Sequence, residues 1–431
     1  MTKALHVLHL AKGSVAHYHG GPSLLVHLML QGQEHTKNST LAMSAVFDDA
    51  FIYSCEESTH KTRSFYQRGG DSIRQRVAQR IFPRTLRFLV GVAFSTLRFL
   101  FHMERAVRKV GRSHHIVFHS HDLISAYLCR LRYHQKYPLI FTMHSKGGAV
   151  REAVMQYPIF RGTFVERILK RIEAITTRHA DIITFPSSGA RTLFENEYPG
   201  LLNSKDVRVV YTGANTEELD SVTGDANLLA KYVIGPENLV VLCIGALIKD
   251  KGIDTLIEAM ALLPEDVRSR LSCLIVGRGQ LEGELQSLIA EKGLQDKVKL
   301  LGFLPRQELL QLMKSVTAFV LPSRADVFPY VLLEVGAMAL PVIATTVGGN
   351  LETFDEDSAL LVPPDEPRAL AAAITRLLTD GELRKQLSES VYHRVRCKFS
   401  LESMFNSYLA IYEEVAKRYG DRSLERKKPI T

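Results

Sequence analysis

The sequence predicts an α/β protein built from two doubly wound domains. At 431 residues the chain is long enough for two domains of roughly 150–200 residues each. Short apolar strand patterns alternate with helical patterns along its length, which is typical of parallel sheets with crossover helices. Two such series of strands and helices are indicated. Each begins with an apolar strand that ends in a loop, at Leu5–Leu10 and at Leu239–Gly245. We therefore expect two Rossmann-like domains in tandem, facing each other across a cleft.

The first half contains the elements of one such domain. After Leu5–Leu10 comes a loop with Gly20, Gly21 and Pro22, and then a helical stretch from about Ser23 to Gln31. Later strands are expected at 116–119, 139–143, 181–185 and 207–211. We expect this domain to span residues 1–215.

The second half repeats the architecture without a detectable sequence repeat. Strands are expected at 239–245, 271–276, 298–301 and 318–321, and helices at 254–263, 281–291 and 307–314. The polar stretch from Thr216 to Pro236 lacks strong periodicity, so we expect the hinge there and the second domain at 216–400. Residues 401–431 read as a C-terminal helix that packs back towards the N-terminal domain, followed by a basic tail. One helix stripe would carry Met404, Tyr408, Ile411 and Tyr412.

Composition excludes several classes of protein. The chain is 46% hydrophobic and 23% charged, which is ordinary for a globular protein. Its five cysteines form no C-x-x-C pair, so neither a disulfide framework nor a zinc site is indicated. Residues 1–10 lack the features of a signal peptide, and no run of 18 apolar residues occurs. We therefore expect a cytoplasmic protein.

One segment carries most of the net charge of +8. Residues 74–112 contain nine arginines and one lysine against the single acid Glu104, a local balance of +9. From Leu86 the pattern predicts a helix, and Pro83 suits its start. Its apolar face would contain Leu89, Val90, Ala93, Leu97, Leu100 and Phe101, flanked by Arg84, Arg87, Arg98, Arg105, Arg108 and Lys109. The segment is either a solvated helix face, with its apolar side on the sheet, or a contact for an anionic membrane surface or a polyanionic acceptor. No nucleic-acid-binding signature accompanies it, so we expect no nucleic-acid partner.

The most informative block runs from the strand end at Leu321 through Glu334. A Pro-Ser turn follows the strand, a loop presents Asp326, and a helix begins near Tyr330 and carries Glu334. Open α/β sheets bind ligands at the carboxyl ends of their strands, and a helix N-terminus there favours a diphosphate. The two carboxylates, eight residues apart, would accept hydrogen bonds from sugar and ribose hydroxyls.

This block resembles the donor-binding signature of the large retaining GT-B glycosyltransferase family four, also called glycosyl transferases group 1. The family pattern is an acid, seven residues and a Glu, and it is matched in register by Asp326, Phe328, Pro329, Val331, Leu332, Leu333 and Glu334. The stretches 245–254, 275–279 and 301–303 are similar to three further family loops, and Gly20-Gly21 and His119-Ser120-His121 are similar to two N-terminal motifs. The resemblance implies a GT-B architecture and sugar transfer from a nucleotide-diphosphate sugar to a glycan or lipid-linked acceptor. It also implies a place in cell-envelope polysaccharide or glycolipid biosynthesis.

The resemblance assigns roles residue by residue. Lys251 would neutralise the donor diphosphate, Asp326 would hold hydroxyls of the transferred sugar, and His121 would contact that sugar near its reacting carbon. These three are the expected catalytic residues. The expected donor-binding residues are Gly20, Gly21, Gly245, Lys251, Gly277, Phe303, Asp326, Phe328, Pro329 and Glu334, with Glu334 on the ribose. The reaction would proceed by front-face attack with no protein nucleophile, no cofactor and no metal. His119 and His144 are read as structural.

Three departures from the family pattern leave an alternative open. Ala246 stands where the family loop carries Arg, Asp326 replaces the first Glu, and residues 212–215 replace an N-G-x-D motif. They are compatible with an altered donor. They are also compatible with a catalytically weak GT-B subunit that binds a glycan or a partner protein.

Overall fold

The structure is a computed structural model, and it divides the chain into two compact units. It describes residues 4–11, 21–36, 41–46, 51–52, 84–110, 114–134, 136–225, 227–232, 234–235 and 238–425. Unit 1 comprises residues 1–186, 190–210 and 404–431, and unit 2 comprises residues 187–189 and 211–403. The chain passes from unit 1 to unit 2 at Val210/Tyr211, ahead of the polar stretch 216–236 where we expected the hinge.

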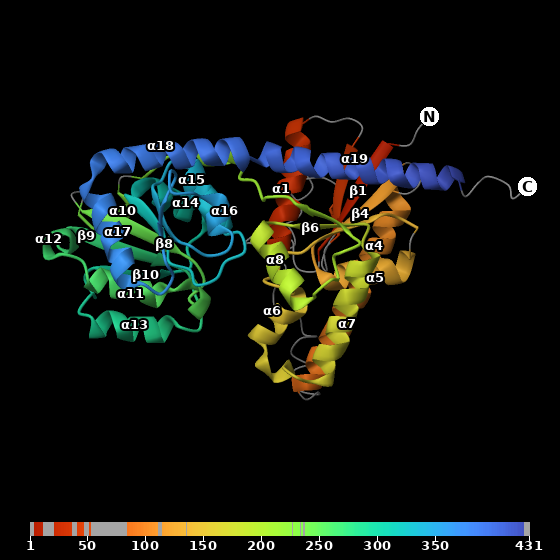
Figure 1. The fold of residues 1–431 in the computed structure, drawn as a ribbon, viewed down its shortest axis with the longest axis horizontal. Helices are drawn as coiled ribbons and strands as arrows, with labels where there is room; N and C mark the ends of the chain where they lie inside the picture. Colours follow the sequence, from red (N-terminus) through yellow and green to blue (C-terminus); the bar gives the residue numbers. More distant parts are fainter. Residues whose placement is uncertain are drawn as a thin grey trace, which may run out of the picture. The chain divides into compact units, whose positions relative to one another are not determined.

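Unit 1 is a doubly wound sheet of seven strands in the order β3-β2-β1-β4-β5-β6-β7 (Figure 1). The strands are β1 (Ala4–Leu10), β2 (Leu41–Val46), β3 (Phe51–Ile52), β4 (His114–Ser120), β5 (Leu139–Thr142), β6 (Ile182–Phe185) and β7 (Asp206–Val209). All neighbours pair in parallel except β3, which pairs antiparallel with β2. The helical elements are α1 (Gly21–Thr36), α4 (Arg84–Val110), α5 (Leu123–Tyr133), α6 (Ala149–Gln156), η1 (Pro158–Phe160), α7 (Phe164–His179) and α8 (Ser188–Glu197).

Unit 2 is a parallel sheet of six strands in the order β10-β9-β8-β11-β12-β13. The strands are β8 (Leu239–Ile244), β9 (Leu271–Val276), β10 (Val298–Gly302), β11 (Ala318–Leu321), β12 (Val342–Thr345) and β13 (Leu360–Val362). The helical elements are α9 (Thr216–Asp220), α10 (Leu228–Lys231), η2 (Lys249–Lys251), α11 (Ile253–Ala261), α12 (Glu265–Arg268), α13 (Glu282–Glu291), α14 (Arg306–Ser315), α15 (Tyr330–Ala337), α16 (Asn350–Thr353), α17 (Pro367–Thr379) and α18 (Gly381–Lys398).

Unit 2 has a separate hydrophobic core on each face of its sheet. Alternate residues of a strand point to opposite faces, so Val240 and Leu242 of β8 join one core while Val241 and Cys243 join the other. Helices α14, α15 and α18 cover the first core, and α11, α13 and α17 cover the second. Burial on both faces explains why these strands are continuous apolar runs.

The last helix, α19 (Leu401–Glu425), belongs to unit 1 from Met404 onwards. The predicted stripe of Met404, Tyr408, Ile411 and Tyr412 is buried throughout. At the start of this return, Ala214 and Ser400 form a parallel bridge. A Cβ on Gly213 would lie 2.3 Å from the carbonyl oxygen of Ser400, so only glycine allows this approach. No helix in the described part of the chain is long and apolar enough to cross a membrane.

Candidate active site

In each unit, two of the predicted site residues follow the two strands between which the strand order reverses. In unit 2 the strand order reverses direction between the neighbouring strands β8 and β11. Lys251 follows β8 in the chain, and Asp326 follows β11. In unit 1 the strand order reverses between β1 and β4, and Gly20 and His121 follow these strands. Such a switch point leaves a crevice at the carboxyl ends of the strands, where open α/β sheets bind ligands.

Lys251 and Asp326 form an ion pair in unit 2. Lys251 is the last residue of η2, and Gly252 after it adopts φ 60°, which favours glycine. A Cβ on Gly245 would lie 3.5 Å from Cγ of Lys251, so this loop passes directly beside the lysine stem. The hydroxyl of Ser323 donates to the same oxygen of Asp326 over 3.2 Å. The structure therefore brings together Gly245, Lys251 and Asp326.

Close backbone approaches between glycine loops hold this arrangement. A Cβ on Gly277 would lie 1.9 Å from the carbonyl oxygen of Gly245, and one on Gly348 would lie 1.9 Å from that of Asp326. Real Cβ atoms do not approach an oxygen so closely, so both positions require glycine. Gly277 thus fixes the loop that carries Gly245, and Gly348 fixes the loop that carries Asp326.

Arg324 joins the loops that carry the ion pair, a role that was not predicted from the sequence. Its guanidinium donates to both carboxylate oxygens of Asp254, over 2.7 and 2.8 Å, and to Asp365 over 2.5 Å. Its backbone N–H also donates to the carbonyl of Asp250 over 2.7 Å. Two-point Arg–carboxylate pairs are the geometrically specific ones. Arg324 thereby fixes the Asp326 loop against the Lys251 loop.

Glu334 lies in the second turn of α15 and is buried. Arg306, at the start of α14, donates to Oε1 of Glu334 over 2.6 Å, and it also donates to Glu218 over 3.2 Å. Burial raises the pKa of Glu334, and the charge of Arg306 opposes that rise. Arg306 was not among the predicted site residues, because sequence does not reveal that α14 and α15 bring these side chains together.

The aromatic residues of the predicted site have different surroundings. Phe303 follows β10 and is 53% exposed. The ring of Phe328 is partly buried between Tyr211 and Phe399, with ring centres 5.4 and 5.7 Å apart. Pro329 precedes the first residue of α15, where its fixed φ suits a helix start. Phe303 therefore offers a ring surface for a ligand, whereas the ring of Phe328 packs against the hydrophobic core.

In unit 1, His121 belongs to a cluster of buried imidazoles. Nε2 of His121 lies 3.0 Å from Nδ1 of His9, and the ring of His144 lies 5.8 Å from that of His121. His119 is hydrogen-bonded through both nitrogens, to the Tyr412 hydroxyl over 2.7 Å and to Oγ1 of Thr142 over 2.6 Å. This agrees with a structural role for His119.

Burial keeps these imidazoles neutral. It lowers the pKa of His9 to about 3 and that of His144 to about 4, and it lowers the pKa values of His119 and His121 well below the usual range. Nδ1 of His121 is buried and has no hydrogen-bond partner among the described residues. A neutral imidazole with one nitrogen bonded to His9 can present the other to a sugar hydroxyl.

His9, His119 and His121 also place nitrogen atoms within 4.8 Å of one another, as a metal site would require. However, both nitrogens of His119 already have protein partners. The sequence expectation of no metal therefore stays a prediction. Of the N-terminal glycines, Gly20 lies outside the described residues, and Gly21 is the first residue of α1.

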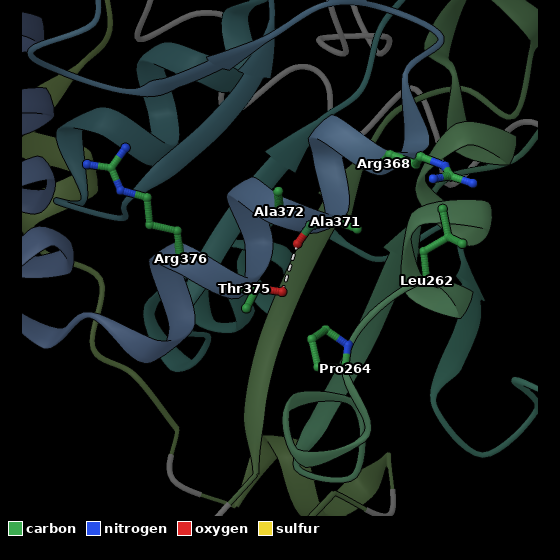
Figure 2. A pocket seen from close by; sticks show the side chains of 7 residues that line it. All are labelled: Leu262, Pro264, Arg368, Ala371, Ala372, Thr375 and Arg376. Carbon is green, nitrogen blue, oxygen red and sulfur yellow. Dashed lines mark hydrogen bonds between the residues drawn. The ribbon is translucent and has the colours of Figure 1, made fainter.

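A hollow of about 590 Å³ in unit 2 contains none of the predicted site residues (Figure 2). It is lined by Leu262, Pro264, Arg368, Ala371, Ala372, Thr375 and Arg376. Figure 2 shows the guanidinium groups of Arg368 and Arg376 at opposite ends and pointing apart. The Thr375 hydroxyl donates to the carbonyl of Ala371. Because few polar groups converge on the hollow, we do not place the donor there.

Two doubly wound units, each with polar or charged residues at its switch point, are the architecture of the GT-B class of glycosyltransferases. Residues 225–394 match the family described as glycosyl transferases group 1, and residues 55–218 match glycosyltransferase family 4. The two matches together cover well over half of the chain. The protein belongs to glycosyltransferase family 4, whose retaining enzymes transfer a sugar from a nucleotide-sugar donor, and this confirms the predicted family, fold and enzyme class.

Named relatives and solved structures are similar over most of the chain. Alpha-D-kanosaminyltransferase from Streptomyces kanamyceticus is 28% identical over 285 residues, which is 64% of this chain and 71% of that protein. Sucrose-phosphate synthase from Thermosynechococcus elongatus has the same fold, with a TM-score of 0.70 and 21% identity over 95% of this chain and 99% of that one. HepE from Anabaena, solved with UDP-glucose, superimposes with a TM-score of 0.64 and 17% identity over 97% and 100% of the two chains.

Proposed function

We propose that this enzyme moves a hexose or related sugar from a nucleotide-diphosphate donor to a glycan or lipid-linked acceptor, with retention of anomeric configuration. The proposed pathway is the synthesis of cell-envelope polysaccharide or glycolipid, on the cytoplasmic side of the membrane. The observation that carries the proposal is the Lys251–Asp326 ion pair beside the switch point of unit 2. It supplies a cation for a diphosphate and a carboxylate for sugar hydroxyls on adjoining loops.

In this proposal the donor separates the two charges. The ammonium group of Lys251 then pairs with the diphosphate instead of Asp326. There it stabilises the negative charge that develops on the leaving group. Asp326 then accepts hydrogen bonds from the transferred sugar. His121 is the proposed contact for the reacting carbon of the sugar. Phe303 packs against the nucleobase, and Glu334 holds the ribose. Gly20 and Gly21 are the proposed backbone contacts for the phosphates, because glycine allows a close approach.

We further propose that the reaction needs no metal ion, because Lys251 and oriented backbone amides neutralise the diphosphate. The test is release of nucleoside diphosphate from a panel of UDP-, GDP- and dTDP-sugars, starting with UDP-glucose. Activity should be equal in EDTA and in Mg²⁺ or Mn²⁺. Activity that EDTA abolishes and a divalent cation restores would contradict metal independence.

Ala246 favours a second candidate function, a catalytically weak subunit that binds a glycan or a partner protein. Ala246 is exposed beside Gly245, so the family's second phosphate-binding cation is missing while space for it remains. The same donor panel separates the candidates, because a binding subunit would release no nucleoside diphosphate from any donor. If the enzyme is active, Ala246→Arg should leave turnover unchanged or raise it.

The basic segment supports a contact with an anionic membrane surface. The structure describes α4 from Arg84, and the described side chains start at Thr96. Phe99, Met103, Ala106, Val107 and Val110 form the buried face, whereas Leu97 and Phe101 of the predicted apolar face are exposed beside Arg98 and Arg105. We propose that this exposed face binds anionic lipid. Binding to anionic vesicles should weaken with salt and with glutamate at Arg84, Arg87 and Arg98. Equal recovery with neutral and anionic vesicles at low salt would contradict it.

A further inference from the structure

Helix α7 distributes its side chains in the reverse of the usual way. Its buried residues are Glu173, Thr176 and Thr177. Leu169 and Ile172 are half-buried, but three other large apolar residues face solvent: Phe164 is 69% exposed, Ile168 is 40% exposed and Ile175 is 47% exposed. An amphipathic helix normally buries its apolar stripe against the core. Among the residues that the structure describes, none covers Phe164, Ile168 and Ile175 enough to bury them.

The polar face of α7 is held in place by specific contacts. The buried carboxylate of Glu173 accepts hydrogen bonds from the backbone N–H of Ala149 over 2.6 Å and from the Tyr198 hydroxyl. The hydroxyls of Thr176 and Thr177 donate to carbonyls one turn earlier in the helix. The two hydroxyl bonds lie within α7, whereas the Glu173 contacts join α7 to Ala149 and Tyr198 and so hold its polar face inward.

The exposed residues form one continuous stripe. Phe164, Ile168 and Ile175 are separated by four and seven residues, which places them on the same side of an α-helix. The segment just before α7 adds two exposed apolar side chains, because Ile159 is 80% exposed and Tyr157 is 54% exposed. Contiguous apolar surface of this kind marks an interaction site.

The charges beside the stripe are positive. Arg167, Arg171 and Arg178 are exposed along one flank of α7, and none forms an ion pair within the described part of the chain. Among the described side chains of residues 149–179, the one exposed acid is Glu152, which lies on α6. An apolar stripe with a cationic flank matches the chemistry of a bilayer surface that contains anionic lipid.

The stripe connects directly to the candidate site of unit 1. His144 follows β5 in the imidazole cluster, and α6 begins five residues later at Ala149. In Figure 1, α6 and the first turns of α7 extend away from the strands of unit 1. His121 and His144 follow the carboxyl ends of β4 and β5. A membrane in contact with α6 and α7 would therefore lie on the side of unit 1 that these chain segments lead to.

We propose that the α7 stripe, formed by Tyr157, Ile159, Phe164, Ile168 and Ile175 with Arg167, Arg171 and Arg178, is a docking surface for an anionic lipid bilayer. It is separate from the α4 segment. The proposal deepens the proposed function and rests on it in one respect, because a bilayer on this hairpin brings a lipid-linked acceptor to unit 1. Vesicle binding by the stripe itself does not require transferase activity.

A single tryptophan provides a direct test, because the chain contains none. The Phe164→Trp variant would carry the only reporter, on the stripe. Its emission should shift to shorter wavelength with vesicles of phosphatidylcholine and phosphatidylglycerol, but not with phosphatidylcholine alone, and salt should reverse the shift. The matched control is Leu262→Trp in unit 2, where Leu262 is 49% exposed. Its emission should not change.

Co-sedimentation with the same vesicles gives the second measurement. The double variant Phe164→Glu/Ile168→Glu should bind about a hundredfold more weakly, since each large apolar side chain removed from the interface costs about tenfold. The change Arg171→Glu should weaken binding about fivefold or more. Leu262→Glu should bind like the wild type.

Other results would overturn the inference. If wild-type protein binds anionic vesicles while the Phe164→Trp emission stays unchanged, α4 alone makes the contact. If the protein dimerises in solution and Phe164→Glu abolishes the dimer, a second copy covers the stripe. Absence of vesicle binding would reject both membrane surfaces. Donor binding is measured separately by thermal shift with UDP-glucose and without vesicles, so a loss of the transferase function is recognised independently. Phe164→Glu should leave that shift unchanged.

Discussion

The carboxylate of Glu334 occupies a buried position where its charge depends on Arg306. Burial raises the pKa of Glu334, and Arg306, 2.6 Å away, favours the ionised form. A ribose hydroxyl that binds this carboxylate would meet a group already oriented by the guanidinium. Arg306 is therefore a positioning residue for the proposed ribose contact.

The variant Glu334→Ala should lose both donor binding and stability. Removal of the carboxylate leaves Arg306 with Glu218 as its remaining acidic partner. Because Arg306 is partly solvated, we expect a loss of about 1 kcal/mol in the free energy of unfolding. Glu334→Gln, which keeps a hydrogen-bond acceptor, should lose less. Urea denaturation followed by circular dichroism measures the free energy of unfolding of both variants. If Glu334→Ala were as stable as the wild type, the buried pair of Glu334 and Arg306 would not contribute to stability.

At this scale the sequence predicted which residues follow the strands of the sheet, but not their partners. Lys251 and Asp326 were predicted through the family motifs, and they contact each other in the structure. Arg306 and Arg324 were missed because their acidic partners are 28 and 70 residues away along the chain. Many exposed arginines have the same local sequence character, so only the folded backbone identifies these two.

Helix α19 completes unit 1 by packing two tyrosines against the imidazole cluster. Tyr412 is fully buried, and its hydroxyl lies 2.7 Å from Nδ1 of His119. Tyr408 stacks beside it, with ring centres 6.0 Å apart. The C-terminal helix is thus part of the support for the residues around His121.

The variant Tyr412→Phe should destabilise unit 1 while preserving its shape. The change leaves a buried nitrogen of His119 without a partner, which costs about 1–3 kcal/mol. The helical content should be unchanged, and hydrogen exchange should increase in β4 and α19 more than in unit 2. Tyr392→Phe in α18 serves as the control, because the Tyr392 hydroxyl forms no hydrogen bond with another described residue. Equal stability of Tyr412→Phe and wild type would contradict the role of this hydrogen bond.

Elements with long apolar runs were predicted well from the sequence. The bounds of β9 and β11 agree with the expected ranges 271–276 and 318–321, because both strands are buried on both faces. Strands β2, β12 and β13 were not predicted, since short runs such as Leu41–Val46 do not distinguish a strand from a buried helix segment. The exposed stripe of α7 was also missed. Sequence periodicity shows that a helix has an apolar face, but it does not show whether that face is buried or exposed to solvent.

The whole molecule should lose stability in mild acid because of the imidazole cluster. The pKa of His9 is lowered to about 3 and that of His144 to about 4, against about 6.5 in an unfolded chain. Between these values the unfolded state binds more protons than the folded state. The free energy of unfolding therefore falls as pH drops below about 6.5, by about 1.4 kcal/mol per pH unit for each such histidine.

Replacement of one member should reduce this slope. In His9→Gln the dependence of the unfolding free energy on pH, between pH 4.5 and 5.5, should be shallower than in wild type by about 1.4 kcal/mol per pH unit. The carboxylates titrate in both proteins, so the difference isolates the histidine. An identical slope in the two proteins would show that His9 is protonated in the folded state.

The proposed donor site of unit 2 depends on Lys251 as the residue that neutralises the donor diphosphate. The most direct measurement is the rate of nucleoside diphosphate release by Lys251→Ala, compared with the wild type and with Lys385→Ala, an exposed lysine on α18. Loss of a charge that acts on the leaving group should cost about 2–4 kcal/mol, or roughly 10²–10³-fold in rate, with the fold unchanged. Lys385→Ala should match the wild type. Near-normal turnover by Lys251→Ala would contradict the assignment of the donor site.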